Sequence, residues 1–111
     1  MIGAGAEKKR PLDGIKVLDF TTTIVGPTVT RYLADHGATV VKVESMVHPE
    51  TLRVGTPYAA NKPGINRSGY FAVYNAGKLG MSLNMNKPKA IEVVRRLVEW
   101  ADIRVSQANE A

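Results

Sequence analysis

The feature that most constrains the fold is a strand–helix–strand pattern near the N-terminus. The apolar runs Ile15–Phe20 and Thr39–Ser45 are typical of strands buried in a sheet. Between them, Gly26 and Pro27 favour the start of a helix, and Gly37 favours its end. Four residues of the intervening segment recur at helical spacing: Val29, Tyr32, Leu33 and His36. A strand, a helix of about ten residues and a strand predict a βαβ unit of a parallel sheet with a right-handed crossover.

The same alternation continues to the end of the chain. We expect an irregular segment over Met46–Ser68, where prolines and glycines break any periodicity. A short helix over Gly69–Ala76, a strand over Leu79–Met85, a helix over Pro88–Ala101 and a strand over Asp102–Gln107 follow. The buried stripe expected on the last helix consists of Ala90, Val94, Leu97, Val98 and Ala101. Together these elements predict an α/β fold, a Rossmann-like parallel sheet with flanking helices.

A chain of 111 residues holds one domain at most. We expect a flexible tail over residues 1–10, followed by a partial Rossmann-like domain over residues 11–111. The pattern stops just after a strand and lacks the next helix, although a parallel sheet needs cover on both faces. We therefore expect the N-terminal part of a larger fold, whose last helix and strand expose apolar surface and favour self-association or a partner.

Composition and charge argue against several classes of partner. The net charge is +5, but the basic residues are scattered and lack the dense stripe with interleaved aromatics of nucleic-acid readers. No apolar run approaches the roughly 18 residues that span a bilayer, and the N-terminus is too short and too polar for a signal peptide. The chain has no cysteine, so we expect neither a disulfide framework nor a thiolate metal site. We predict a cytoplasmic protein without a nucleic-acid or membrane partner and without a bound metal.

The loop that follows the first predicted strand, Thr21–Pro27, contains one glycine. A dinucleotide-binding turn uses three glycines to let the backbone approach the pyrophosphate, so NAD is disfavoured. The loop nevertheless leaves the carboxyl end of a strand, where open α/β sheets bind their ligands. Its backbone N–H groups and the helix N-terminus near Pro27 would favour developing negative charge. The alternative is that the loop is a simple connection into the helix.

Four segments in order carry a resemblance to a known family: PLDGIKVLDFTTTIVGP, YLADHGATVVKVE, YFAVYNAGKLGMSLNM and AIEVVRRLVEWADIRV. Their order and spacing, from about Pro11 to Val105, resemble the N-terminus of family III CoA-transferases. That family includes carnitine-linked CoA-transferases, formyl-CoA transferases and α-methylacyl-CoA racemases. The resemblance implies a Rossmann-like domain that binds coenzyme A within a larger, interlocked fold, with a homodimer or heteromer in the complete enzyme.

The resemblance also implies which residues hold CoA, as a substrate that is not covalently bound. The pantetheine arm would reach the first loop at Thr22, Thr23 and Ile24. Lys78 ends a segment that matches the family pattern N-x-x-K, and it would meet a phosphate of CoA. Leu83 matches an apolar contact to the adenine region. The alternatives are a solvated lysine for Lys78 and a core-facing strand residue for Leu83.

The chain departs from the family pattern at positions that commonly help to hold CoA. Ser45 stands where a basic residue often follows V-K-x-E, and Asn86 stands where a lysine is common. Ser106–Ala108, with Gln107 at its centre, stands where the family often has E-N-F after the fourth strand. Ile24 stands where the first loop usually has a large or polar residue. Either another basic residue substitutes, such as Arg53 or Arg67, or CoA binding is altered.

The reaction implied by the resemblance is transfer of CoA between carboxylic acids. An aspartate attacks the acyl-CoA thioester, which gives a mixed anhydride and then an aspartyl-CoA thioester. That aspartate lies beyond the matched segment, so this chain alone is predicted to be inactive. A noncatalytic CoA- or nucleotide-binding assembly module of a split or heteromeric enzyme, and an acyl-CoA racemase, stay as alternatives.

No residue of the chain is predicted to be catalytic. Asp19 and Asp102 are the nearest imitators of the nucleophile, but the family motif makes Asp19 structural. Glu44 is likewise expected to be structural. His36 lies at a helix end and is expected at the surface, and His48 lies in the long loop without an assigned partner.

Overall fold

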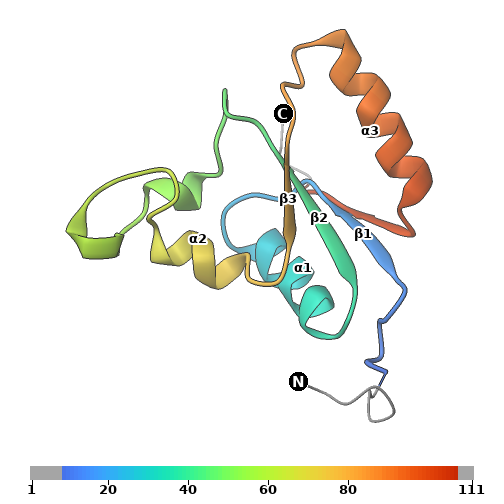
Figure 1. The fold of residues 1–111 in the computed structure, drawn as a ribbon, viewed down its shortest axis with the longest axis horizontal. Helices are drawn as coiled ribbons and strands as arrows, with labels where there is room; N and C mark the ends of the chain where they lie inside the picture. The colour runs from blue at the N-terminus through green and yellow to red at the C-terminus, as the bar shows by residue number, and fades with distance from the viewer. Residues whose placement is uncertain (1–8, 108–111) are drawn as a thin grey trace.

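The computed structural model describes residues 9–107 as a parallel sheet with helices on both faces (Figure 1). The helices and strands, in chain order, are β1 (Lys16–Asp19), α1 (Val25–Asp35), β2 (Thr39–Glu44), η2 (Thr51–Val54), η3 (Ala59–Asn61), α2 (Gly69–Tyr74), β3 (Leu79–Ser82), α3 (Pro88–Trp100) and β4 (Ile103–Val105). The order and type of the predicted strands and α-helices are confirmed. Of the tail predicted over residues 1–10, residues 1–8 lie outside the described residues.

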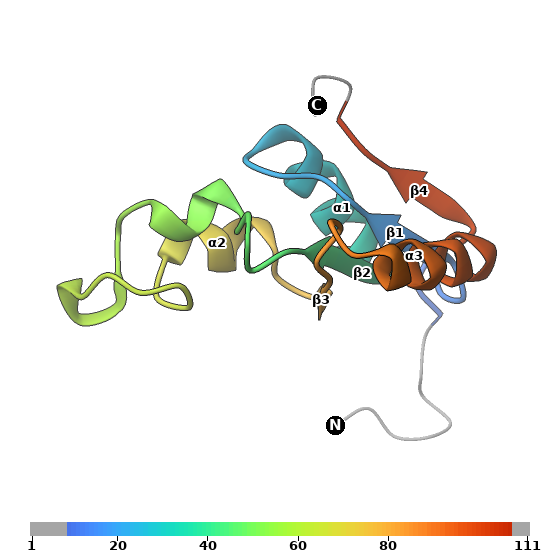
Figure 2. The ribbon, with the colours of Figure 1, turned by 90° about the horizontal axis from the view of Figure 1, so that it is seen from above.

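The sheet has the strand order β3-β2-β1-β4, and all three pairings are parallel. Val17 is one of the residues of β1 that pair on both sides, with Val40 of β2 and with Ile103 of β4. After β3 the chain crosses to the opposite edge of the sheet, where β4 pairs with β1. A right-handed crossover then puts α3 on the face opposite α1, as Figure 2 shows. The predicted Rossmann-like α/β fold is confirmed.

The core lies between β1, β2 and α1, because β1 and β2 are the two inner strands of the sheet and α1 packs against both of them. Its buried centre is formed by Val17, Ala34, Ala38 and Val40, and Leu12, Ile15, Leu33 and Val105 pack around it. Three consecutive residues of β1 are fully buried, which explains why this strand reads as a continuous apolar run instead of an alternating one.

The buried face of α1 consists of small and polar residues: Gly26, Pro27, Thr30 and Ala34. Val29 and Tyr32, whose spacing helped to predict the helix, are 46% and 61% exposed. Gly26 explains the difference, because a Cβ at this position would overlap the side chain of Thr21. The helix therefore approaches the first loop closely and leaves Val25, Val29 and Tyr32 exposed, while Leu33 packs against the core.

The turn after α1 has the geometry predicted from Gly37. Its φ of +112° lies in the region that favours glycine. The N–H of Gly37 donates to the carbonyl of Ala34, and the N–H of Ala38 donates to the carbonyl of Leu33. These two bonds form a Schellman motif, which satisfies helix carbonyls and directs the chain into β2.

The outer elements expose apolar side chains, as expected for a partial fold. Ile91 and Val98 of α3 and Ile103 of β4 are exposed, although Val98 belongs to the stripe predicted to be buried. On the other edge of the sheet, Leu79 of β3 is exposed as well. Within residues 9–107, no helix is long and apolar enough to cross a bilayer.

Candidate functional site

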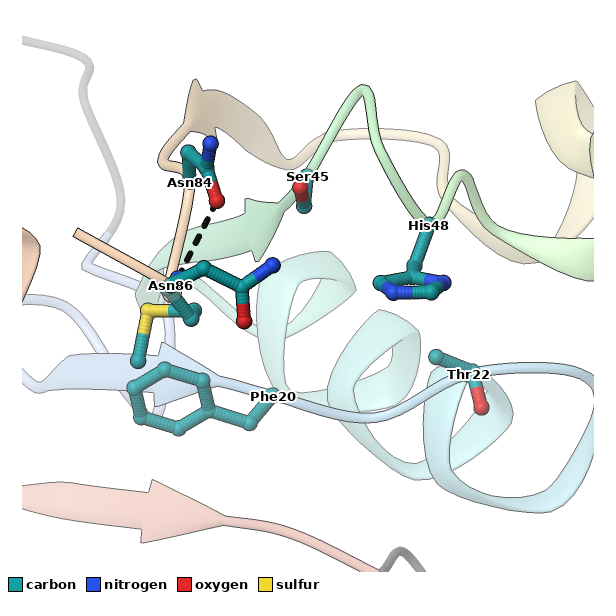
Figure 3. Close-up of a pocket in the computed structure, with 7 residues that line it drawn as sticks. Phe20, Thr22, Ser45, His48, Asn84 and Asn86 are labelled. Carbon is teal, nitrogen blue, oxygen red and sulfur yellow. Dashed lines mark hydrogen bonds between the residues drawn. The ribbon is translucent and has the colours of Figure 1, made fainter.

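A cleft of about 390 Å³ opens where β1, β2 and β3 end (Figure 3). We call it the strand-end cleft, and its lining residues are Phe20, Thr22, Ser45, His48, Asn84, Met85 and Asn86. Each of them follows one of the three strands by one to four residues. This is the edge at which open α/β sheets bind ligands, and the volume is within the range of about 300–1,000 Å³ found for small-molecule sites.

The wall after β3 is a tight turn. The N–H of Asn86 donates to Oδ1 of Asn84 at 3.0 Å, which fixes the turn, and the N–H of Leu83 donates to the carbonyl of Glu44 at 2.9 Å. Figure 3 shows the side chains of Asn86 and His48 turned toward the same space, with Phe20 on the opposite side of Asn86 from Asn84. The cleft thus combines amide and imidazole groups with an aromatic ring.

Beneath the first loop, Asp19 forms the centre of a buried polar cluster. Its side chain is fully buried and accepts hydrogen bonds from the Thr21 N–H at 2.7 Å, the Thr21 hydroxyl at 2.5 Å and the Thr30 hydroxyl at 2.7 Å. Burial alone would raise the pKa of Asp19, but the hydrogen bonds from Thr21 and Thr30 and the charge of Lys42 outweigh it, so the pKa is lowered. Asp19 is a structural carboxylate, as the family motif implied.

Lys78 is the ionic partner of Asp19. Its Nζ lies 3.1 Å from Oδ2 of Asp19, 2.8 Å from Oδ1 of Asn75 and 3.1 Å from the carbonyl oxygen of Pro27, and its side chain is 2% exposed. Desolvation lowers the pKa of Lys78, although the charge of Asp19 opposes the shift. The ammonium group joins β1, α1 and the segment before β3. Lys78 does not line the strand-end cleft, and its phosphate contact stays a prediction.

A second buried ion pair lies between Lys42 of β2 and Glu50. Their Nζ and Oε2 atoms are 2.9 Å apart, and both side chains are buried. Lys42 also donates to the carbonyl oxygen of Thr21 at 2.7 Å, and Oε1 of Glu50 accepts from the N–H of Thr23. Thr23 has a φ of +69°, a conformation uncommon for a residue with a side chain. The pair therefore holds the backbone on both sides of Thr22.

The two arginines named as substitutes for the missing basic residues make their contacts within the fold. Arg53 binds Glu44 through two contacts of 2.7 and 2.8 Å and lies over the ring of Phe71. Desolvation would raise the pKa of Glu44, but the contacts of this carboxylate outweigh it, so the pKa is lowered. The hydrogen bond from Arg53 is the largest of these lowering contributions. Arg67 donates to the carbonyl oxygens of Ala59 and Lys62. Neither arginine lines the strand-end cleft, so the structure does not support this substitution.

Among the residues assigned to CoA binding from the sequence, Thr22 lines the strand-end cleft. Thr23 and Ile24 are exposed in the same loop, whereas Leu83 is half-buried and belongs to the turn after β3 without lining the cleft. The first three backbone N–H groups of the loop, which were expected to favour developing negative charge, have partners within the protein. The Thr21, Thr22 and Thr23 N–H groups already donate to Asp19, Gln107 and Glu50, respectively.

The departures from the family pattern cluster at this site. Ser45 and Asn86 line the strand-end cleft, and Oε1 of Gln107 accepts from the Thr22 N–H at 2.6 Å. The sequence alone assigns no role in the cleft to four of its lining residues: Phe20, His48, Asn84 and Met85. Their shared signal is their position at or shortly after the carboxyl end of a predicted strand, because neighbouring parallel strands end at one edge of the sheet.

The comparisons with known proteins agree with this architecture. The family model described as CoA-transferase family III matches residues 12–110. This chain belongs to that family. The family assignment covers almost the whole chain, and it confirms the resemblance stated from the four sequence segments.

Individual members of the CoA-transferase family show how much of an enzyme this chain represents. It is 36% identical over 98 residues to succinate–glutarate CoA-transferase of Agrobacterium fabrum, covering 86% of this chain and 24% of that protein. It is 39% identical over 95 residues to formyl-CoA:oxalate CoA-transferase of Escherichia coli, covering 86% and 22%. A CaiB/BaiF family protein from Brucella suis superposes with a TM-score of 0.76 at 34% identity, covering 89% of this chain and 26% of that chain. The chain thus spans about a quarter of the length of these relatives, and its fold is that of their N-terminal part.

Proposed function

We propose that this chain is the N-terminal CoA-binding segment of a family III CoA-transferase that moves CoA between carboxylic acids. The observation that carries the proposal is the strand-end cleft, which lies at the ligand-binding edge of a sheet that belongs to this family. By their names, two of the relatives named above are CoA-transferases, one for succinate and glutarate and the other for formyl-CoA and oxalate. An acyl-CoA donor and a carboxylic acid acceptor are therefore the proposed substrates.

The chemistry of the cleft supports part of a CoA molecule as its ligand. Phe20 and Met85 supply apolar surface, whereas Asn84, Asn86 and His48 supply hydrogen-bonding groups. Such a mixture suits a ligand with both apolar and polar parts, whose few polar contacts fix its orientation. Thr22, Thr23 and Ile24 are proposed to contact the pantetheine arm from the first loop. The contacts of Lys78 and Leu83 with CoA are proposed from the family pattern alone.

The nucleophilic aspartate is proposed to lie outside this chain. None of the residues lining the strand-end cleft carries a carboxylate. Asp19 is fully buried, and both of its oxygens accept hydrogen bonds from threonines. A nucleophile must reach the thioester carbon, which a carboxylate enclosed in this way cannot do. The chain alone is therefore proposed to lack transferase activity.

Assembly with further protein is part of the same proposal. Apolar side chains are exposed on α3 and β4, and also on α1, where Val25, Val29 and Tyr32 lie at helical spacing. Exposed apolar surface of this kind favours association, as a homodimer or as a heteromer with the remainder of an enzyme. Solution mass measurement of residues 1–111 tests this point, and a stable monomer would contradict it.

A noncatalytic assembly module that binds CoA or a nucleotide is the second candidate. It is favoured by one observation: Ser45 and Asn86, two of the departures from the family pattern, both line the strand-end cleft. An acyl-CoA racemase is a further alternative at the level of the complete enzyme.

Calorimetry with CoA and NAD tests the proposed ligand. CoA should bind more tightly than NAD, because the first loop lacks the glycines of a dinucleotide site. Tighter binding of NAD would contradict the proposal. Assays with acyl-CoA donors and carboxylate acceptors test the activity of the chain. If the unmodified chain turns over and a folded Asp19→Asn variant does not, the proposed absence of a nucleophile is wrong.

A further inference from the structure

Two walls of the strand-end cleft, the loop after β1 and the segment after β2, come from different parts of the chain. Thr22 belongs to the loop after β1, whereas His48 belongs to the segment after β2. Lys42 and Glu50 lie next to these walls, and neither of them lines the cleft. Their ion pair connects these two walls.

Both members of the pair bind the backbone of the first loop. The Lys42 ammonium donates to the carbonyl oxygen before Thr22, and the Glu50 carboxylate accepts from the N–H after it. The N–H of Leu52 also donates to Glu50, at 3.4 Å, and the N–H of Glu50 donates to Oε2 of Glu44 at 2.7 Å. These bonds fix the position of the segment that carries His48 relative to the loop that carries Thr22.

We propose that Glu50, held by Lys42, is a positioning residue that sets the distance between the two walls of the strand-end cleft for its ligand. The inference deepens the proposed function, since CoA is the ligand used to test it. It rests on the bonds to both sides of Thr22 and on the left-handed conformation of Thr23, which an unsupported threonine rarely adopts.

A contribution to stability explains the Lys42–Glu50 ion pair less well than a positioning role does. Burying two charges costs desolvation energy, and replacing a buried ion pair by apolar residues of similar volume is often neutral or stabilising. A methionine and a leucine would fill the space of Lys42 and Glu50 without charge. They would not provide an acceptor for the Thr23 N–H or a donor for the Thr21 carbonyl.

Two double variants of the full chain separate positioning from stability. Lys42→Met with Glu50→Gln keeps an acceptor for the Thr23 N–H, and Lys42→Met with Glu50→Leu removes it. Both variants lack an unpaired buried charge, and they carry the same net charge. Glu92→Gln on the exposed surface of α3 is the control for loss of a carboxylate. The measurements are thermal unfolding, CoA affinity by calorimetry and amide hydrogen exchange at Thr23.

We expect both double variants to unfold at similar temperatures, while the leucine variant binds CoA about tenfold more weakly than the glutamine variant. A tenfold loss follows if the loop adopts the binding geometry in about a tenth of the molecules. Exchange of the Thr23 amide should be faster in the leucine variant. Equal CoA affinity and equal exchange in the two variants would overturn the proposal, as would unfolding of both variants, because the pair would then serve stability alone.

The two proposals fail in different ways. If the unmodified chain binds no CoA, the proposed ligand is wrong, and the exchange of the Thr23 amide still decides the positioning role. If CoA binds but the exchange and affinity of the two variants agree, the ligand stands and the positioning role of Glu50 is wrong.

Discussion

Removing the charge of Lys78 gives the sharpest test of how the first loop is supported. In Lys78→Met, the methionine fills much of the same space but leaves the fully buried Asp19 without its ionic partner. Breaking a buried ion pair costs about 3–5 kcal/mol, because the remaining charge is uncompensated. Three hydrogen-bond donors from Thr21 and Thr30 stay on Asp19. We therefore expect the lower end, a loss of about 3 kcal/mol in the free energy of unfolding.

Thermal and urea unfolding measure this loss. For a domain of about 100 residues, 1 kcal/mol shifts the Tm by roughly 4–8 °C, so about 3 kcal/mol predicts a fall of about 12–24 °C. Lys89→Met, an exposed lysine on α3, is the matched control and should leave the Tm nearly unchanged. Adding Asp19→Asn to Lys78→Met should recover about 1 kcal/mol or more, because the buried charge is then gone.

A contact between Lys78 and CoA predicts a different result for Lys78→Met. If Lys78 meets a phosphate of CoA, Lys78→Met should weaken CoA by about 1–2 kcal/mol more than it weakens dephospho-CoA or pantetheine, with little change in Tm. That outcome would refute the expectation that Lys78 mainly stabilises the folded chain through Asp19, and it would support the proposed phosphate contact. A loss of stability below about 1 kcal/mol would refute it as well, since surface lysines cost no more than that.

Three further outcomes follow from the structure. Asp19 and Glu44 have lowered pKa values, so the unfolded chain binds more protons than the folded one in acid. The stability they contribute should be complete above about pH 5 and should be lost as the pH falls through the lowered pKa values. Urea midpoints that stay constant from about pH 5 to about pH 2.5 would contradict this. Gly26→Ala should cost about 1–3 kcal/mol in urea unfolding, because its Cβ would overlap Thr21, whereas Gly80→Ala meets no atom within 4 Å and serves as the control. His48→Ala should weaken CoA binding in calorimetry by about 1 kcal/mol without a change in Tm, and unchanged affinity would remove His48 from the site.

The order of strands and helices was determined by the sequence. Apolar runs, helical spacing and the glycines and prolines at element ends are local signals, and the prediction of an α/β sheet from them is confirmed. The position of the first loop at the carboxyl end of β1 follows from the same signals. So does the Schellman turn at Gly37, because its positive φ is a property of one residue and its immediate neighbours.

Which side chains meet was decided by the tertiary structure. Lys78 and Asp19 lie far apart in the chain, and nothing in the local pattern pairs them; the parallel register of β1, β2 and β3 brings their segments together. The buried face of α1 likewise depends on the close approach of Gly26 to Thr21, which overrides the apolar spacing of the helix. The strand-end cleft depends on three strands ending side by side. Contacts of this kind arise from packing between segments distant in sequence, so a pattern read within single segments indicates the edge where a ligand binds but not the residues that meet there.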